Sequence, residues 1–121
     1  ELKNTYHQKY PGSCLHECVF DDKYLSVYNV KTLDIAKALI DYGFHPPTVY
    51  FPLIVKGALM IEPTETESKE TLDQFATAMK AIAQQAERDS ERLRQAPQKP
   101  KVCRLDETRA ARYPVLRWKQ S

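Results

Sequence analysis

The sequence predicts an α+β fold: a two-layer sandwich in which a small, mostly antiparallel sheet carries helices on one face. Three observations lead to this fold class. Two stretches with helical apolar spacing alternate with short β-rich stretches. Prolines and glycines punctuate the boundaries between them. The 121 residues are enough for a single domain with a modest hydrophobic core.

The first part of the chain predicts a strand followed by a helix. Residues 15–20 are β-rich, and the turn residues 21–23 follow them. Thr32 is predicted to cap a helix that runs through Tyr42, and Gly43 stands where a left-handed residue ends such helices. The apolar stripe of this helix comprises Leu33, Ala36, Leu39 and Ile40.

The middle of the chain predicts two neighbouring strands. Pro46 and Pro47 exclude a helix, because proline lacks the amide hydrogen and constrains the residue before it. Residues 48–51 and 58–62 read as strands joined by a short connection, which favours antiparallel pairing.

The clearest local signal is a long helix within residues 67–88, with Ser68 as its cap. Asp89 and Ser90 interrupt or recap it, and residues 91–95 add another turn or two. A last short helix is expected over residues 106–112. The apolar face of the long helix comprises Leu72, Phe75, Ala76, Met79, Ile82, Ala83 and Ala86.

Charge divides the chain into two parts. Residues 1–98 carry 11 basic and 14 acidic groups, a net of −3, whereas residues 99–121 carry 7 basic and 2 acidic groups, a net of +5. We interpret 1–98 as the domain and 99–121 as a basic tail that packs on the domain or on a partner, because apolar residues interleave its charges. No recognition motif for nucleic acid accompanies the charge.

The sequence gives no sign of a membrane span or a signal peptide, and cytoplasmic localisation is the default expectation. The chain begins at Glu1 and not at Met, so we expect the natural protein to extend upstream. Three cysteines without a secretory signal favour reduced thiols. On a strand, Cys14, His16 and Cys18 would share a face, but a fourth ligand is missing and no metal site is predicted.

Few residues are candidates for chemistry. The serines lack a nucleophile-elbow setting, and the three glycines lie too far apart for a phosphate-binding loop. The carboxylates of EPTETESKE are best read as a solvated helix entrance. His45 is the most interesting titratable residue, although its role on residues alone is more simply to tie the helix end to the next strand.

Longer stretches resemble a known family. DYGFHPPTVYFPL, followed by ALMIEPTETESKETLDQF, is similar to the C-terminal part of the P-protein of the glycine cleavage system, the decarboxylating glycine dehydrogenase. LHECVF and RLDETRAARYPVLRW resemble the start and end of the same region. The form PPTVYFPLIV looks like the second subunit of the two-subunit bacterial enzyme.

The resemblance implies a small C-terminal domain of a fold-type I pyridoxal-phosphate enzyme. Such enzymes decarboxylate glycine and pass its aminomethyl carbon to the lipoyl group of H-protein, with the cofactor as electron sink. The implied partners are glycine dehydrogenase subunit 1 and lipoylated H-protein. The cofactor lysine of the family lies upstream, and no lysine here matches its motif, so the chain alone is expected to be inactive.

In the same resemblance, residues 41–53 lead from the first helix of the small domain into its sheet, and the small domain of such enzymes closes over the cofactor cleft. The possible cleft-lining residues are His45, Thr48, Glu62, Thr64 and Glu65. The alternative is a free-standing, non-catalytic module that binds a small ligand or a partner protein. With its covering surfaces missing, the isolated chain is expected to self-associate through residues 50–53 or the tail around Trp118.

Overall fold

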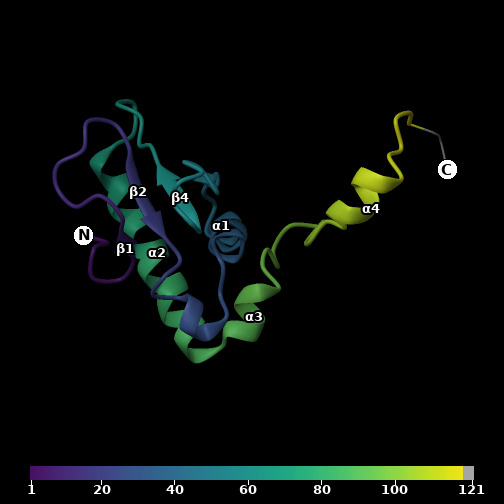
Figure 1. The fold of residues 1–121 in the computed structure, drawn as a ribbon, viewed down its shortest axis with the longest axis horizontal. Helices are drawn as coiled ribbons and strands as arrows, with labels where there is room; N and C mark the ends of the chain where they lie inside the picture. The colour runs from purple at the N-terminus through teal and green to yellow at the C-terminus, as the bar shows by residue number, and fades with distance from the viewer. Residues whose placement is uncertain (119–121) are drawn as a thin grey trace.

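The structure, a computed structural model, describes residues 1–118. A small sheet and two packed helices form its body, and a C-terminal segment reaches away from that body (Figure 1). In chain order the elements are β1 (His7–Gln8), β2 (Cys18–Asp21), the 3₁₀ helix η1 (Ser26–Tyr28), α1 (Thr32–Asp41), β3 (Thr48–Val49), β4 (Ala58–Ile61), α2 (Lys69–Arg88), α3 (Ser90–Arg94) and α4 (Glu107–Arg112).

The sheet has four strands in the order β1-β2-β4-β3, and every neighbouring pair is antiparallel. The central pair aligns Cys18 with Ile61 and Asp21 with Ala58. On the outside of β4, Thr48 faces Met60. The predicted antiparallel pairing of the two middle strands is therefore confirmed, although β3 is only two residues long.

Alternate residues of the strands face two different environments. Phe20, Leu59 and Ile61 join the main core, which they share with the buried faces of α1 and α2. Val19 and Ala58 point the other way and pack with Val55 in a smaller cluster. This alternation follows from the pleat of a strand, and it puts the helices on one face of the sheet as predicted.

The long helix follows its sequence signals closely. Ser68 Oγ accepts the amide of Thr71 at 3.1 Å, which confirms the predicted cap of α2. Asp89 ends α2 and accepts the amide of Arg92, so it recaps the chain at α3. Met79 and Ile82, on the predicted apolar face, are fully buried.

The start of α1 differs from the prediction that Thr32 is its cap. The helix begins at Thr32 itself, and Asp34 Oδ2 accepts the backbone amide of Lys31 at 2.8 Å. Lys31 therefore occupies the cap position and Thr32 is the first residue of the helix, where its hydroxyl donates to the carbonyl of Gly57 at 2.6 Å. The predicted left-handed Gly43 is confirmed, with φ at +84°.

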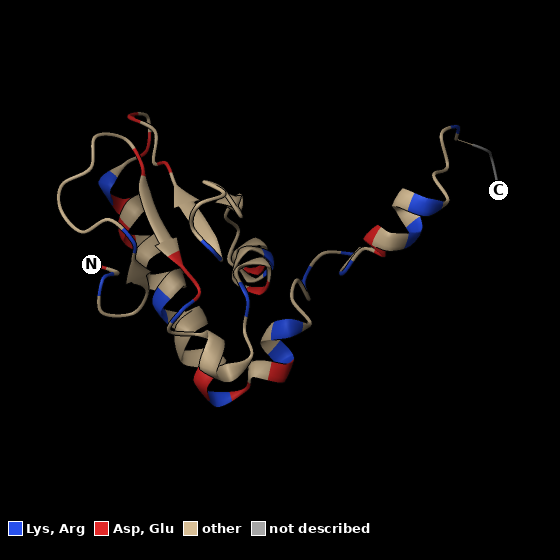
Figure 2. Ribbon diagram, viewed as in Figure 1, with Lys and Arg blue, Asp and Glu red and all other residues tan. Residues whose placement is uncertain are grey.

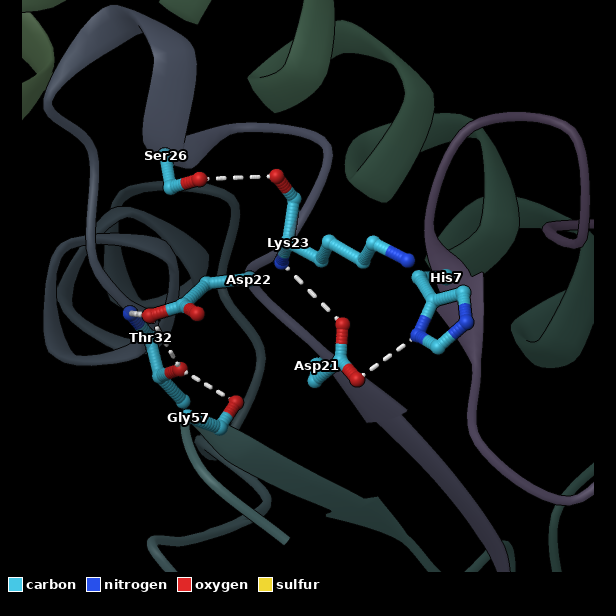
Figure 3. A network of polar contacts seen from close by, with 7 residues as sticks. All are labelled: His7, Asp21, Asp22, Lys23, Ser26, Thr32 and Gly57. Atoms are coloured by element: carbon cyan, nitrogen blue, oxygen red, sulfur yellow. Dashed lines mark hydrogen bonds and ion pairs between the residues drawn. The ribbon is translucent and has the colours of Figure 1, made fainter.

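The residues around Thr32 form a polar network that joins three parts of the fold (Figure 3). Asp22, just after β2, accepts the Thr32 amide at 3.1 Å, and the Thr32 hydroxyl lies 3.1 Å from the same carboxylate oxygen. Gly57 stands directly before β4 with φ at +67°. The end of β2, the start of α1 and the turn into β4 are therefore fixed to one another.

The observed strand β2 is shorter than the strand predicted over residues 15–20, and it lies further along the chain. The observed β2 begins at Cys18, so residues 15–17 are not part of a strand. Cys14 and His16 therefore do not share a strand face with Cys18, and the geometry supposed for them is wrong. The two-residue strand β1 and the helix η1 were not predicted from the sequence.

The C-terminal helix lies close to its predicted place. Asp106 caps α4 by accepting the amide of Arg109 at 2.8 Å. None of the residues of α4 is buried. The division of the chain at residue 98 stays a prediction, as does the surface on which the tail packs.

Candidate functional site

A cleft of about 460 Å³ opens at the β3 edge of the sheet, between the β3–β4 strands and the start of α2. Three segments distant in sequence meet there: the proline-rich stretch after α1, the end of β4 with the residues after it, and the first turns of α2. The residues that line the cleft are Phe44, His45, Pro46, Pro47, Thr48, Met60, Ile61, Glu62, Pro63, Thr64, Glu67, Thr71, Leu72 and Phe75.

Two aromatic rings connect the cleft to the core. Phe44 and Phe75 meet edge to face, with ring centroids 5.3 Å apart and planes at 90°. Both are partly buried against the main core. Gly43 permits the reversal after α1 that brings Phe44 back toward α2. One wall of the cleft is therefore tied to the packing of both helices.

Four of the five candidate residues from the sequence line this cleft: His45, Thr48, Glu62 and Thr64. All four are exposed to solvent. Glu65 is also exposed, but it is not among the lining residues. The structure therefore brings together residues 14 or more positions apart in the chain, from both sides of the β3–β4 connection.

His45 has a defined local orientation. Its Nδ1 lies 2.9 Å from the carbonyl oxygen of Pro46. A carbonyl only accepts, so this contact places the proton on Nδ1 and leaves Nε2 as the atom that can bind another group. The contact joins two neighbouring residues of the turn. It does not tie the end of α1 to β3, which is the simpler role that the sequence suggested for His45.

Sequence reasoning missed the contribution of α2 to this site. Glu67, Thr71 and Phe75 line the cleft from the helix entrance and its first turns. The prediction that Phe75 lies on the apolar face of the helix is correct. It does not show that this face extends from the core into the cleft. Leu72 is 39% exposed for the same reason.

The charges of the cleft limit what it can bind. Its lining includes the carboxylates Glu62 and Glu67 and the imidazole of His45, and among residues 1–118 no Lys or Arg lines it. Pyridoxal phosphate needs an amine for its aldehyde and donors for a phosphate dianion. The residues of the cleft do not fit that cofactor. They suit a small polar or cationic group held against apolar walls.

A second polar cluster lies at the opposite edge of the sheet. His7 Nδ1, on β1, is 2.7 Å from Asp21 Oδ2, and the Lys23 amide donates to the other carboxylate oxygen at 3.1 Å (Figure 3). The ring of Tyr24 packs edge to face against that of His7. Both oxygens of the buried Asp21 are used within the fold, so we interpret this cluster as a clamp that joins β1 to β2.

The cysteines are unpaired in the structure. Burial, with a smaller contribution from the neighbouring Cys14, raises the pKa of Cys18 to about 11. Within residues 1–118, no three His, Cys, Asp or Glu side chains come together as metal ligands would. No helix in this described part is long and apolar enough to cross a membrane.

The fold and the cleft together define a class of protein. This is a small α+β domain that presents a cleft at a sheet edge, and the described residues that line the cleft do not fit the cofactor that the sequence resemblance implies. Residues 1–102 match the sequence model of the family described as "Glycine dehydrogenase, C-terminal domain". The chain therefore belongs to the glycine dehydrogenase C-terminal domain family.

Relatives with curated sequences agree with this membership. The chain is 55% identical over 118 residues to a protein of Caldanaerobacter subterraneus, and 54% identical over 121 residues to one of Caulobacter vibrioides. A Listeria innocua protein is 53% identical over 120 residues. Each is named "Probable glycine dehydrogenase (decarboxylating) subunit 2". The alignments cover 98–99% of this chain but only 23–25% of the relatives' length.

Proposed function

We propose that the chain is the C-terminal domain of a pyridoxal-phosphate-dependent glycine decarboxylase of the glycine cleavage system. The observation that carries the proposal is the identity of 53–55% to proteins named as subunit 2 of this enzyme, over nearly the whole chain. The share of 23–25% of those proteins supports a role as one part of a longer enzyme, in place of a free-standing module.

The cofactor belongs, in this proposal, to polypeptide outside the chain. When bound there, pyridoxal phosphate supplies an electron sink for the loss of carbon dioxide from glycine. The cleft beside β3 contributes a wall of the reaction chamber. Phe44 and Phe75 exclude water from that wall, and the Nε2 atom of His45 offers a hydrogen-bonding group at its rim.

The polar rim gives the domain a role in positioning. Thr48 and Thr64 bring hydroxyl groups to the same cleft as the carboxylate of Glu62. These groups are suited to orient the amino group of glycine or the amide portion of a lipoyl arm. Glu65 lies just outside the lining, so we propose that it acts at the cleft entrance, where it meets incoming partners.

The proposed partners are the companion subunit 1 and lipoylated H-protein. The name "subunit 2" of the relatives supports the first of these, since it implies another subunit in their assembly. Cytoplasmic location is also part of the proposal. It is supported by Cys14, Cys18 and Cys103, which are all unpaired as expected of thiols in a reducing compartment.

The test is the exchange of labelled bicarbonate into the carboxyl group of glycine. The complete polypeptide, its companion subunit, pyridoxal phosphate and lipoylated H-protein are combined, and the isolated chain of residues 1–121 replaces the complete polypeptide in the control. We expect exchange only with the complete polypeptide. A complete, cofactor-loaded assembly that leaves glycine unchanged would contradict the proposal.

A further inference from the structure

The C-terminal segment presents an apolar surface that the body of the chain does not cover. We define the arm as residues 105–118, which include α4. The start of the arm, residues 105–108, still borders Leu33 and Lys37 of α1, and the rest of the arm reaches away from the sheet and from α2 (Figure 1). Val115, Leu116 and Trp118 are 88%, 87% and 84% exposed. Large apolar side chains grouped in this way mark an interaction site more often than a free surface.

The arm leaves the body from a well-anchored root. Asp41, at the end of α1, accepts the backbone amides of Gln98 and Lys99 at 2.8–2.9 Å. Arg104 donates to the Asp34 carboxylate at 2.7 Å and to the carbonyl of Ala96. The chain is therefore held to α1 at Gln98, Lys99 and Arg104, although residues 101–104 are themselves exposed. A fixed root directs the arm toward a defined place.

The charge of the arm indicates the chemistry of its partner. The two carboxylates, Asp106 and Glu107, stand at the start of α4, and Asp106 is used as the helix cap. From residue 109 to residue 118 there are three arginines and no carboxylate. Figure 2 shows the basic residues gathered after the acidic start of α4. The complementary surface is an apolar groove with an acidic rim.

The arm extends beyond the domain that defines the family. The family match ends at residue 102, whereas the alignments with relatives named as subunit 2 extend over 98–99% of the chain. In Figure 1 the amino terminus lies on the side of the body opposite the arm. Polypeptide that joins the domain at its amino terminus therefore starts from the far side.

We propose that the arm docks on the companion subunit of the enzyme, in an apolar groove rimmed by Asp and Glu side chains. This inference rests on the proposed function, because that function supplies the companion. The apolar residues from Leu105 to Trp118 fill the groove, and Arg109, Arg112 and Arg117 pair with its rim. The root at Arg104 keeps the arm oriented for this contact before the two subunits meet.

The test is site-directed photo-crosslinking in the complete two-subunit enzyme. A benzophenone amino acid replaces Tyr113 on the arm or, as the matched control, the exposed Tyr10 on the body. We expect the probe at position 113 to crosslink to the companion subunit and the probe at position 10 to do so much less. Crosslinks to the upstream part of the same polypeptide, or between two copies of it, would overturn the proposal. Crosslinking no stronger than that at position 10 would also overturn it.

Charge reversal gives an independent measurement. Arg109→Glu with Arg112→Glu is expected to weaken binding of the companion subunit about tenfold or more, measured by sedimentation. Lys3→Glu with Lys9→Glu makes the same charge change on the body and is expected to alter binding less than twofold. Equal effects of the two pairs would refute docking through the arm. Glycine exchange is measured separately from crosslinking. If the arm crosslinks to the companion subunit but the assembly does not act on glycine, the proposed function is contradicted and the docking of the arm is not.

Discussion

Replacing Gly57 with alanine tests the polar network that fixes the turn into β4. An added Cβ would lie 2.2 Å from Asp22 Oδ1 and 2.6 Å from Asp22 Cγ. Both distances are far inside van der Waals contact, so the Asp22 carboxylate must move. When it moves, the amide of Thr32 loses its acceptor at 3.1 Å.

The size of the effect follows from two contributions. Gly57 has φ at +67°, and a residue with a side chain loses about 1 kcal/mol in that conformation. The loss of a hydrogen bond to a charged acceptor adds about 1.5–3 kcal/mol. The sum is about 2.5–4 kcal/mol in the free energy of unfolding. With a typical urea dependence for a small domain, the midpoint falls by about 2 M.

Gly43 provides a matched control for this substitution. It also has positive φ, at +84°, but a Cβ built on it meets nothing within 4 Å. Gly43→Ala is therefore expected to cost only the conformational contribution, about 1 kcal/mol. The two variants share the change in unfolded-chain entropy, so their difference isolates the displacement of Asp22.

The assay is urea unfolding followed by circular dichroism. Gly57→Ala in an Asp22→Ala background is expected to cost no more than Gly43→Ala, because the clashing carboxylate is gone. If Gly57→Ala in the natural background costs the same as Gly43→Ala, the carboxylate is not fixed where the structure places it, and the reasoning fails.

Three further predictions concern other parts of the chain. Tyr6→Phe removes a buried hydroxyl that donates to the Met79 carbonyl at 2.8 Å, and is expected to cost about 1–2 kcal/mol in chemical unfolding; an unchanged midpoint would contradict the contact. Iodoacetamide at pH 8 is expected to alkylate Cys18 about 100-fold more slowly than an ordinary thiol, because the pKa of Cys18 is raised to about 11 and the thiolate is the reactive form. Mass spectrometry of the labelled peptides measures the rate of alkylation. Because the folded state favours the neutral thiol, the free energy of unfolding is expected to fall as the pH rises from about 9 to about 11. The isolated chain is expected to self-associate through the exposed Phe51 and Leu53, or through the tail, and light scattering that finds only monomer at high concentration would exclude this.

The local signals in the sequence predicted the positions of the helices well. The predicted apolar stripe of α1 is wrong in part, because Ile35 and Ala38 join Leu39 in the main core whereas Leu33 and Ile40 are only half-buried. The Ser68 cap and the apolar face of α2 are local patterns that involve residues close together in the chain. The observed helix, Lys69–Arg88, starts and ends where these patterns predict. The prediction of Thr32 as the cap is wrong because Lys31 holds that position, where Asp34 accepts its amide, and the Thr32 hydroxyl instead donates to Gly57, 25 residues away. The strand β1 has two residues and exists through its pairing with β2, so no local pattern of its own announces it.

The cleft was predictable only in part. His45 and Thr48 lie at a corner that prolines stiffen, and Glu62 and Thr64 lie at the end of a strand beside a proline. Both features are local, so the sequence alone reveals them. That these two corners face the entrance of α2 depends on the packing of Phe44 against Phe75, which are 31 positions apart. Residues such as Glu67 enter the site through that packing, and sequence spacing alone does not reveal it.

The most direct measurement compares two tryptophan substitutions in the complete, cofactor-loaded enzyme. Leu72→Trp adds bulk inside the cleft beside β3, whereas Val27→Trp adds the same side chain at an exposed position of η1. If the cleft forms a wall of the glycine reaction chamber, bicarbonate exchange falls at least about tenfold in the first variant, the equivalent of about 1.4 kcal/mol, and stays near normal in the second. Full exchange in the Leu72→Trp enzyme, with both variants assembled and folded, would contradict the account.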